Sequence, residues 1–146
     1  MTRLPMIALL ATTALVASGG ASAPAAPAKR LTVAVRSSAF GAVLFDGGGR
    51  ALYAFTKDGP KRSRCFGACA AAWPVAFTSG RPQAGSGVRA GLLGSVARRG
   101  GGRQVTYAGR PLYYYVGDGA GQIRCQNVDE FGGTWLVVRG GGALVR

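Results

Sequence analysis

The chain has 146 residues, the length of one domain, and 48% of them are hydrophobic, which excludes an intrinsically disordered protein. It carries 18 lysines and arginines against 5 acidic residues, a formal net charge of +13, and it contains no histidine. The missing histidine removes the usual general base, a common metal ligand and the usual member of a catalytic triad, so the composition disfavours an enzyme.

The first 28 residues predict a signal peptide followed by a short linker. Arg3 provides a positive start, residues 6–16 form an apolar run, and small residues follow at 17–28. Such a run is too short to span a bilayer as a mature helix, but it is typical of a secretory leader. Ala23 and Ala28 are both expected cleavage points. Because no cysteine lies near the end of the apolar run, we expect export without a lipid anchor.

Two segments of the remaining chain repeat each other at an offset of 60 residues. Residues 49–59 and 109–119 are identical at six of eleven positions. Two further residue types recur in the same order, and the matching pairs are Cys65 with Cys125 and Trp73 with Trp135. Because one copy is too small to bury its apolar face alone, we expect both copies, at about 41–75 and 103–138, to fold into one domain over residues 29–146.

In chain order, the pattern predicts short strands joined by glycine-rich turns, with one β-hairpin in each copy. The expected hairpins are 42–45, the turn 46–49 and 51–55, then 104–107, the turn 108–110 and 112–116. The other expected elements are an edge strand at 31–35, a helix at 68–73 stopped by Pro74, a loop at 78–88, a strand at 93–99 paired with 104–107, a strand at 134–138 and a frayed tail at 143–146. The expected fold is a mainly β, small single domain of two pseudo-repeated β-hairpin units, with one short helix after the Cys-x3-Cys segment.

Aromatic residues alternate along the returning strands of both copies. Side chains two residues apart on a strand share a face, which groups Tyr53 with Phe55 and Tyr113 with Tyr115. We expect these rings to pack into the core between the two halves; the alternative is a platform of rings that binds sugars or other flat ligands. The residues expected on the opposite face are Leu52 and Leu112, and the further core anchors are Trp73 and Trp135.

An aspartate followed by a glycine ends each repeated segment. Asp58 and Asp118 are expected to accept hydrogen bonds from backbone amides in these turns, and either carboxylate could also accept one from a buried tyrosine hydroxyl. The alternative is that the pseudo-symmetry brings both carboxylates together as a general acid and base. Turn capping is the simpler role, and we favour it.

Three cysteines remain in a chain that is expected to be exported. Disulfides persist outside the cytoplasm, and three cysteines allow three pairings, each of which leaves one thiol. Because Cys65 and Cys125 are repeat-equivalent, a bridge across the pseudo-symmetry axis is one of these pairings. As thiolates, Cys65, Cys69 and Cys125 could hold a soft ion such as Cu(I) or Zn(II), although structural zinc normally takes four ligands and no histidine completes the set. No other cofactor is expected.

The repeated segments contain the pattern Yx(FWY)xxD twice, at 53–58 and 113–118. With this motif the chain resembles a bacterial family described as a secreted repeat of unknown function, or as predicted lipoproteins. Further matching stretches are 65–74, 104–107 and 131–135, so that the likeness covers roughly 31–138. The resemblance implies export, a compact β-containing fold and a Cys65–Cys69 bridge, and it implies no activity. Two departures are the absence of a lipobox cysteine and the position of Cys125 outside that pair.

The net charge and the scarcity of catalytic side chains together indicate a binding or structural role. We expect a non-enzymatic protein of the cell envelope or extracellular space, whose basic surface contacts anionic envelope polymers or a membrane surface. Residues 57–64 hold four cations, but no aromatic platform accompanies them, so specific recognition of nucleic acid is not expected. Two alternatives remain. In the first, the arginines reflect a genome rich in GC codons and the positive charge is only a solvated surface without a partner. In the second, the chain is a thiol-based redox or metal-handling surface protein.

Overall fold

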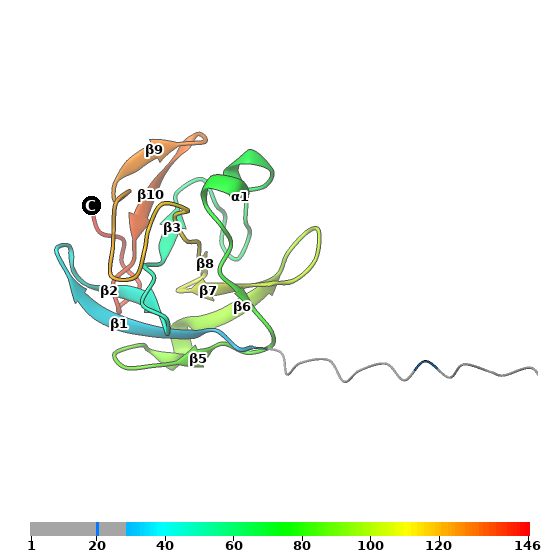
Figure 1. Ribbon diagram of the computed structural model, residues 1–146, viewed down its shortest axis with the longest axis horizontal. Coiled ribbons are helices and arrows are strands. Elements are labelled where there is room, and N and C mark those ends of the chain that lie inside the picture. Colours follow the sequence, from blue (N-terminus) through cyan, green and yellow to red (C-terminus); the bar gives the residue numbers. More distant parts are fainter. Residues whose placement is uncertain (1–19, 21–28) are drawn as a thin grey trace, which may run out of the picture.

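The computed structural model describes residue 20 and residues 29–146 (Figure 1). The expected leader, linker and cleavage points lie outside the described residues, apart from residue 20. The described part is mainly β, with ten strands, one α-helix and one turn of 3-10 helix. None of its helices is long and apolar enough to cross a membrane. The predicted fold class, a small and mainly β single domain, is confirmed.

The first sheet is built around the strand that follows the linker. In spatial order it contains β2 (Gly41–Asp46), β1 (Thr32–Ser38) and β5 (Gln83–Ala84). The prediction of an edge strand at 31–35 is wrong, because part of the segment expected as a loop pairs with β1 in parallel. Gln83 N donates to Leu31 O at 2.8 Å and Gly85 N to Val33 O at 2.7 Å. These bonds satisfy backbone carbonyls that an open edge would leave unpaired.

The second sheet joins the two repeat copies. In spatial order it contains β3 (Tyr53–Phe55), β10 (Gly133–Val137) and β9 (Val128–Glu130), all antiparallel. The first predicted hairpin closes only near its turn, where Leu52 N donates to Leu44 O at 3.0 Å. Beyond this bond β3 leaves β2 and pairs with β10, which places Phe55 opposite Trp135. Pairing between the copies therefore replaces the local hairpin.

The third sheet carries the second predicted hairpin. It contains β4 (Phe77–Thr78), β7 (Arg103–Tyr107) and β6 (Leu93–Ala97) in spatial order, with the short strand β8 (Arg110–Pro111) also paired to β7. The predicted pairing of β6 with β7 is confirmed. Between β7 and β8 the chain turns at Ala108 and Gly109, which have φ of 49° and 75°. Positive φ at both central residues is what a type I′ turn requires.

Residues 112–116, expected as a full returning strand, form only isolated bridges. Tyr113 N donates to Tyr53 O at 2.9 Å, and Tyr53 N donates to Tyr113 O at 2.8 Å. Tyr53 and Tyr113 are equivalent in the two copies. Their reciprocal bonds are the pairing that a pseudo-twofold relation between the copies produces.

Short elements and the final residues complete the domain. Helix α1 (Ala68–Ala72) ends before Pro74, as predicted, and η1 (Ala90–Leu92) leads into β6. The prediction of a frayed tail at 143–146 is wrong. Val145 is buried, and its N–H donates to Val137 O at 3.0 Å. The tail is held because an apolar side chain within it packs into the core.

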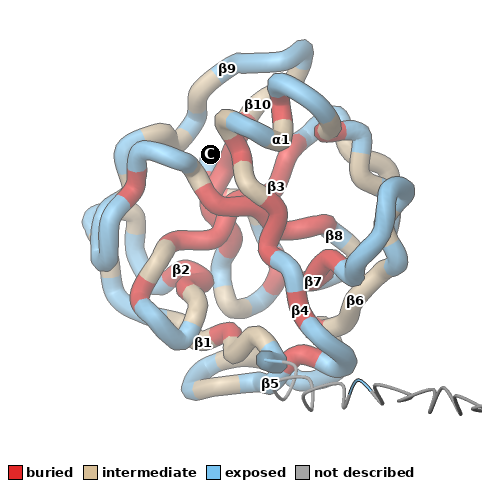
Figure 2. Tube along the Cα trace, turned by 45° about the vertical axis from the view of Figure 1, so that its right-hand side comes forward, coloured by how far each residue is buried: buried red, intermediate tan, exposed pale blue. Residues whose placement is uncertain are grey.

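Two buried clusters fill the domain, and Figure 2 shows the buried chain concentrated where β3, β7, β8 and β10 meet. The main members of the first cluster are Tyr53, Phe55, Trp73, Tyr113, Trp135 and the two cysteines Cys65 and Cys69. The main members of the second are Leu44, Leu52, Tyr107, Leu112 and Val138. The two-residue period of the strands thus separates Tyr53, Phe55 and Tyr113 from Leu52 and Leu112, as the pattern predicts.

Candidate functional site

The repeated motif places its tyrosine and its aspartate in different partnerships. Tyr53 donates its hydroxyl to Asp118 Oδ2 at 2.5 Å, and Tyr113 donates to Asp58 Oδ2 at 2.7 Å. Each tyrosine therefore bonds to the aspartate of the other copy. Neither copy can complete its own motif, which gives a physical reason for two copies in one domain.

The second oxygen of each aspartate closes the turn that follows it. Asp58 Oδ1 accepts from Arg64 N at 2.7 Å, and Asp118 Oδ1 accepts from Arg124 N at 3.0 Å. Turn capping, as expected from the sequence, and the tyrosine bonds together engage both oxygens of each carboxylate. This arrangement fits a structural role and does not offer a free general acid and base.

Burial changes the acidity of these groups. The pKa of Asp58 is raised because burial disfavours its charged form, and bonds from Tyr113 and from the backbone of Arg64 offset part of the rise. Burial also raises the pKa of Tyr53, and its bond to Asp118 adds to this. Burial raises the pKa of Tyr113 in the same way. Both phenols therefore remain protonated donors at neutral pH and cannot serve as bases.

Aromatic rings from both copies form one stack through the core. Trp73 and Trp135 are stacked with centroids 4.0 Å apart, Phe55 stacks on Trp135 at 4.1 Å, and Tyr115 lies against Trp73 at 5.0 Å. Both tryptophans and Tyr53 are fully buried, whereas Tyr115 is partly exposed. The stack therefore has no free ring face of a tryptophan on which a sugar could lie, and its geometry is that of a core.

Two of the three cysteines form a disulfide, Cys65–Cys69, which is the pairing that the resemblance implied. Cys125 is free and partly buried, so the alternative bridge from Cys65 to Cys125 is wrong. The repeat explains the difference: 60 residues after Cys69 stands Asp129, so Cys125 has no equivalent partner. The bridge also removes two of the three thiolates that a soft ion would need, and the described residues contain no cluster with metal-ligating side chains.

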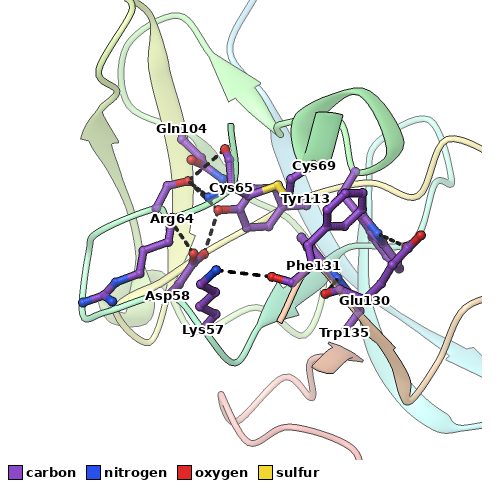
Figure 3. Close-up of a disulfide and its surroundings, with 12 residues drawn as sticks. Lys57, Asp58, Arg64, Cys65, Cys69, Gln104, Tyr113, Glu130, Phe131 and Trp135 are labelled. Atoms are coloured by element: carbon purple, nitrogen blue, oxygen red, sulfur yellow. Dashed lines mark hydrogen bonds between the residues drawn. A yellow bond between two sulfur atoms is a disulfide. The ribbon is translucent and has the colours of Figure 1, made fainter. Parts of the chain in front are cut away.

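A basic cleft lies beside the disulfide, between the segment 61–66 and the tip of the β6–β7 hairpin. Its volume is about 570 Å³. Five cations line it, and no described residue lining it is acidic; the cations are Lys61, Arg62, Arg64, Arg98 and Arg99. We call this surface the basic cleft. Figure 3 shows Asp58 between Tyr113 and Arg64, near the Cys65–Cys69 disulfide.

Arg98 is held in the cleft by several groups. Its Nη1 donates to Ser63 Oγ at 2.6 Å and to Gln104 Oε1 at 2.9 Å, and its Nη2 donates to Cys65 O. Its guanidinium carbon also lies 4.3 Å from the centroid of the Phe66 ring. The cleft therefore contains one cation whose position is fixed from several sides.

Ser63 connects the cleft with the contact between the copies. Its Oγ lies 2.6 Å from the hydroxyl of Tyr113, which in turn donates to Asp58. The sequence pointed to the cations at 57–64 but not to Ser63, Phe66, Arg98 or Gln104. The two arginines just before the glycines at 100–102 were a usable signal, because a hairpin tip carries its flanking side chains to the surface.

Comparison of the sequence with known proteins identifies a family to which the chain is similar. A family model described as "Secreted repeat of unknown function" matches residues 34–77 and 94–139. The two matches correspond to the two copies and together cover more than half of the chain. No curated protein and no solved structure matches.

Proposed function

Because the chain belongs to the family of secreted repeats of unknown function, we propose that it is an exported, non-enzymatic protein that binds anionic polymers of the cell envelope through its basic cleft. The observation that carries this proposal is the lining of the cleft, with five cations and no acidic residue among the described ones. A concave surface lined by charges of one sign concentrates oppositely charged ligands more strongly than scattered surface charges do.

The internal chemistry of the domain supports binding rather than catalysis. Both motif aspartates are engaged by tyrosines and backbone amides, and the tryptophans are stacked in the core. The lining of the cleft, in contrast, has five cations and no acidic residue among the described ones, and the nearby Asp58 interacts with the charges of only two of them, Arg98 and Arg64. One carboxylate cannot balance five cations, so most of this positive charge is available for an external anion.

The test is binding of the secreted protein to an anionic polymer at rising salt. We expect the affinity to fall steeply, since salt screens exposed charges over about 10 Å at 0.1 M. The triple variant Lys61→Gln, Arg62→Gln, Arg64→Gln should weaken binding at low salt by at least about tenfold, on the order of 1.4 kcal/mol.

A matched control removes the same charge elsewhere. The variant Arg36→Gln, Arg89→Gln, Arg139→Gln changes three exposed cations that do not line the cleft. It should weaken binding by less than about threefold, since only the general field of the protein changes. Equal losses in the two variants would contradict a localised site, and an absence of binding to any polymer would refute the proposed function. Preferential binding to anionic vesicles would point to a membrane surface instead.

A further inference from the structure

Two neighbouring guanidinium groups share one aromatic ring in the basic cleft. The guanidinium carbon of Arg98 lies 4.3 Å from the centroid of Phe66, and that of Arg99 lies 4.7 Å from the same centroid. The electron-rich face of an aromatic ring attracts cations, so Phe66 helps to hold both guanidinium groups. The ring therefore gathers two cations on the wall of one cleft.

The two arginines differ in what they leave free. Arg98 Nη1 donates to Ser63 and Gln104 and its Nη2 donates to the carbonyl of Cys65, whereas its Nε makes no hydrogen bond within residues 29–146. Arg99 is exposed, and over residues 29–146 its guanidinium makes no hydrogen bond. Arg98 thus supplies a fixed charge with its Nε still free to donate, while the planar fork of Arg99 leaves all its donors free.

This division of roles fits one chemical group best. A guanidinium fork binds two oxygens at once, and one fork is enough for the two coplanar oxygens of a carboxylate. A tetrahedral phosphate presents oxygens in more than one plane, so it can meet two guanidinium groups together. Lys61, Arg62 and Arg64 on the facing wall provide further charges for neighbouring groups of the same ligand.

Resting on the proposed function, we propose that the ligand of the basic cleft is a phosphate-bearing polymer without bases, such as a polyol or sugar phosphate, and that Arg98 and Arg99 hold one of its phosphates. Nucleic acid shares the phosphates but also needs free aromatic faces for its bases. Phe66 is the one aromatic residue lining the cleft over residues 29–146, and its ring is already covered by the two guanidinium groups.

The experiment compares three polymers of equal charge: poly(glycerol phosphate), polyglutamate and oligothymidylate. The variant Arg99→Lys keeps the charge and removes the fork. We expect the parent protein to bind poly(glycerol phosphate) more tightly than polyglutamate, and we expect Arg99→Lys to weaken binding to poly(glycerol phosphate) by at least about fivefold. The control Arg81→Lys, at an exposed position outside the cleft, should change neither. Because Arg99 is exposed, both variants should keep the melting temperature of the parent protein.

Each other outcome overturns the proposal in a distinguishable way. If polyglutamate binds as tightly as poly(glycerol phosphate), or if Arg99→Lys leaves phosphate binding unchanged, the phosphate site is refuted while polyanion binding stands. If oligothymidylate binds most tightly, the base-free ligand is refuted. If none of the three polymers binds, both this proposal and the proposed function fail.

Discussion

The two repeat copies build a common core but carry different loops after their shared aspartate. The first copy continues with Lys-Arg-Ser-Arg at 61–64, the disulfide and α1, and it forms one wall of the basic cleft. The second copy continues with Gly-Gln-Ile-Arg at 121–124 and reaches β9, with Cys125 unpaired. The internal contacts keep the pseudo-symmetry, whereas the surface of one copy has diverged toward charge.

One backbone position shows what this divergence costs. Lys61 has a φ of 52°, and its repeat equivalent Gly121 has a φ of 73°. Both make the same bond to the other copy: Lys61 N donates to Gly109 O at 2.7 Å, and Gly121 N donates to Gly49 O at 2.8 Å. A lysine in this left-handed region is strained by about 1 kcal/mol, whereas glycine is not. The first copy therefore retains a cation at the mouth of the cleft at the expense of stability, which is typical of a functional position.

The largest expected effect tests the shared part of the two copies. Trp73→Ala and Trp135→Ala should each lower the free energy of unfolding by about 3–5 kcal/mol, because each removes a fully buried ring that stacks on the other. Denaturant unfolding measures both values. The exposed Val116, which is 60% exposed, provides a control, and Val116→Ala should change the free energy by less than about 0.5 kcal/mol. A large effect at only one tryptophan would contradict the claim that the two copies contribute equally to the core.

A smaller effect should separate the two tyrosine–aspartate bonds. Asp118 is only 7% exposed, so Tyr53→Phe leaves a buried carboxylate oxygen without its donor and should lower the free energy of unfolding by about 1.5–3 kcal/mol. Asp58 is partly exposed, so water can replace the lost donor and Tyr113→Phe should cost about 1 kcal/mol. Double-mutant cycles with Asp118→Asn and Asp58→Asn measure the two couplings. Equal couplings, or the reverse order, would contradict this account.

The smallest effect concerns the strained lysine. Lys61→Gly should raise the free energy of unfolding by up to about 1 kcal/mol, since glycine relieves the left-handed strain, and it should weaken polymer binding at the same time. The converse substitution in the second copy, Gly121→Lys, should lower the free energy of unfolding by about 1 kcal/mol. Thermal unfolding and polymer titration check both variants. A Lys61→Gly protein that is less stable than its parent would show that the lysine side chain stabilises the loop.

The sequence predicted the parts of the fold that depend on local periodicity and turn chemistry. It predicted the pairing of β6 with β7, the end of α1 before Pro74 and the separation of the motif's aromatic rings from Leu52 and Leu112. It did not predict that β3 leaves its hairpin for β10, because that exchange depends on packing between residues about 80 positions apart, such as Phe55 and Trp135. The sequence indicated only one wall of the cleft, through the cations at 57–64. Its other wall, with Arg98, comes from a hairpin that only the tertiary fold brings alongside.

The most direct test of the account is to map where a phosphate-bearing polymer contacts the secreted protein. Backbone amide shifts in an NMR titration with poly(glycerol phosphate) should change most at residues 61–66 and 96–104, which form the two walls of the basic cleft. The equivalent loop of the second copy, residues 119–128, should change little. Shifts concentrated at 119–128, or spread evenly over all exposed arginines, would contradict a binding site confined to the basic cleft.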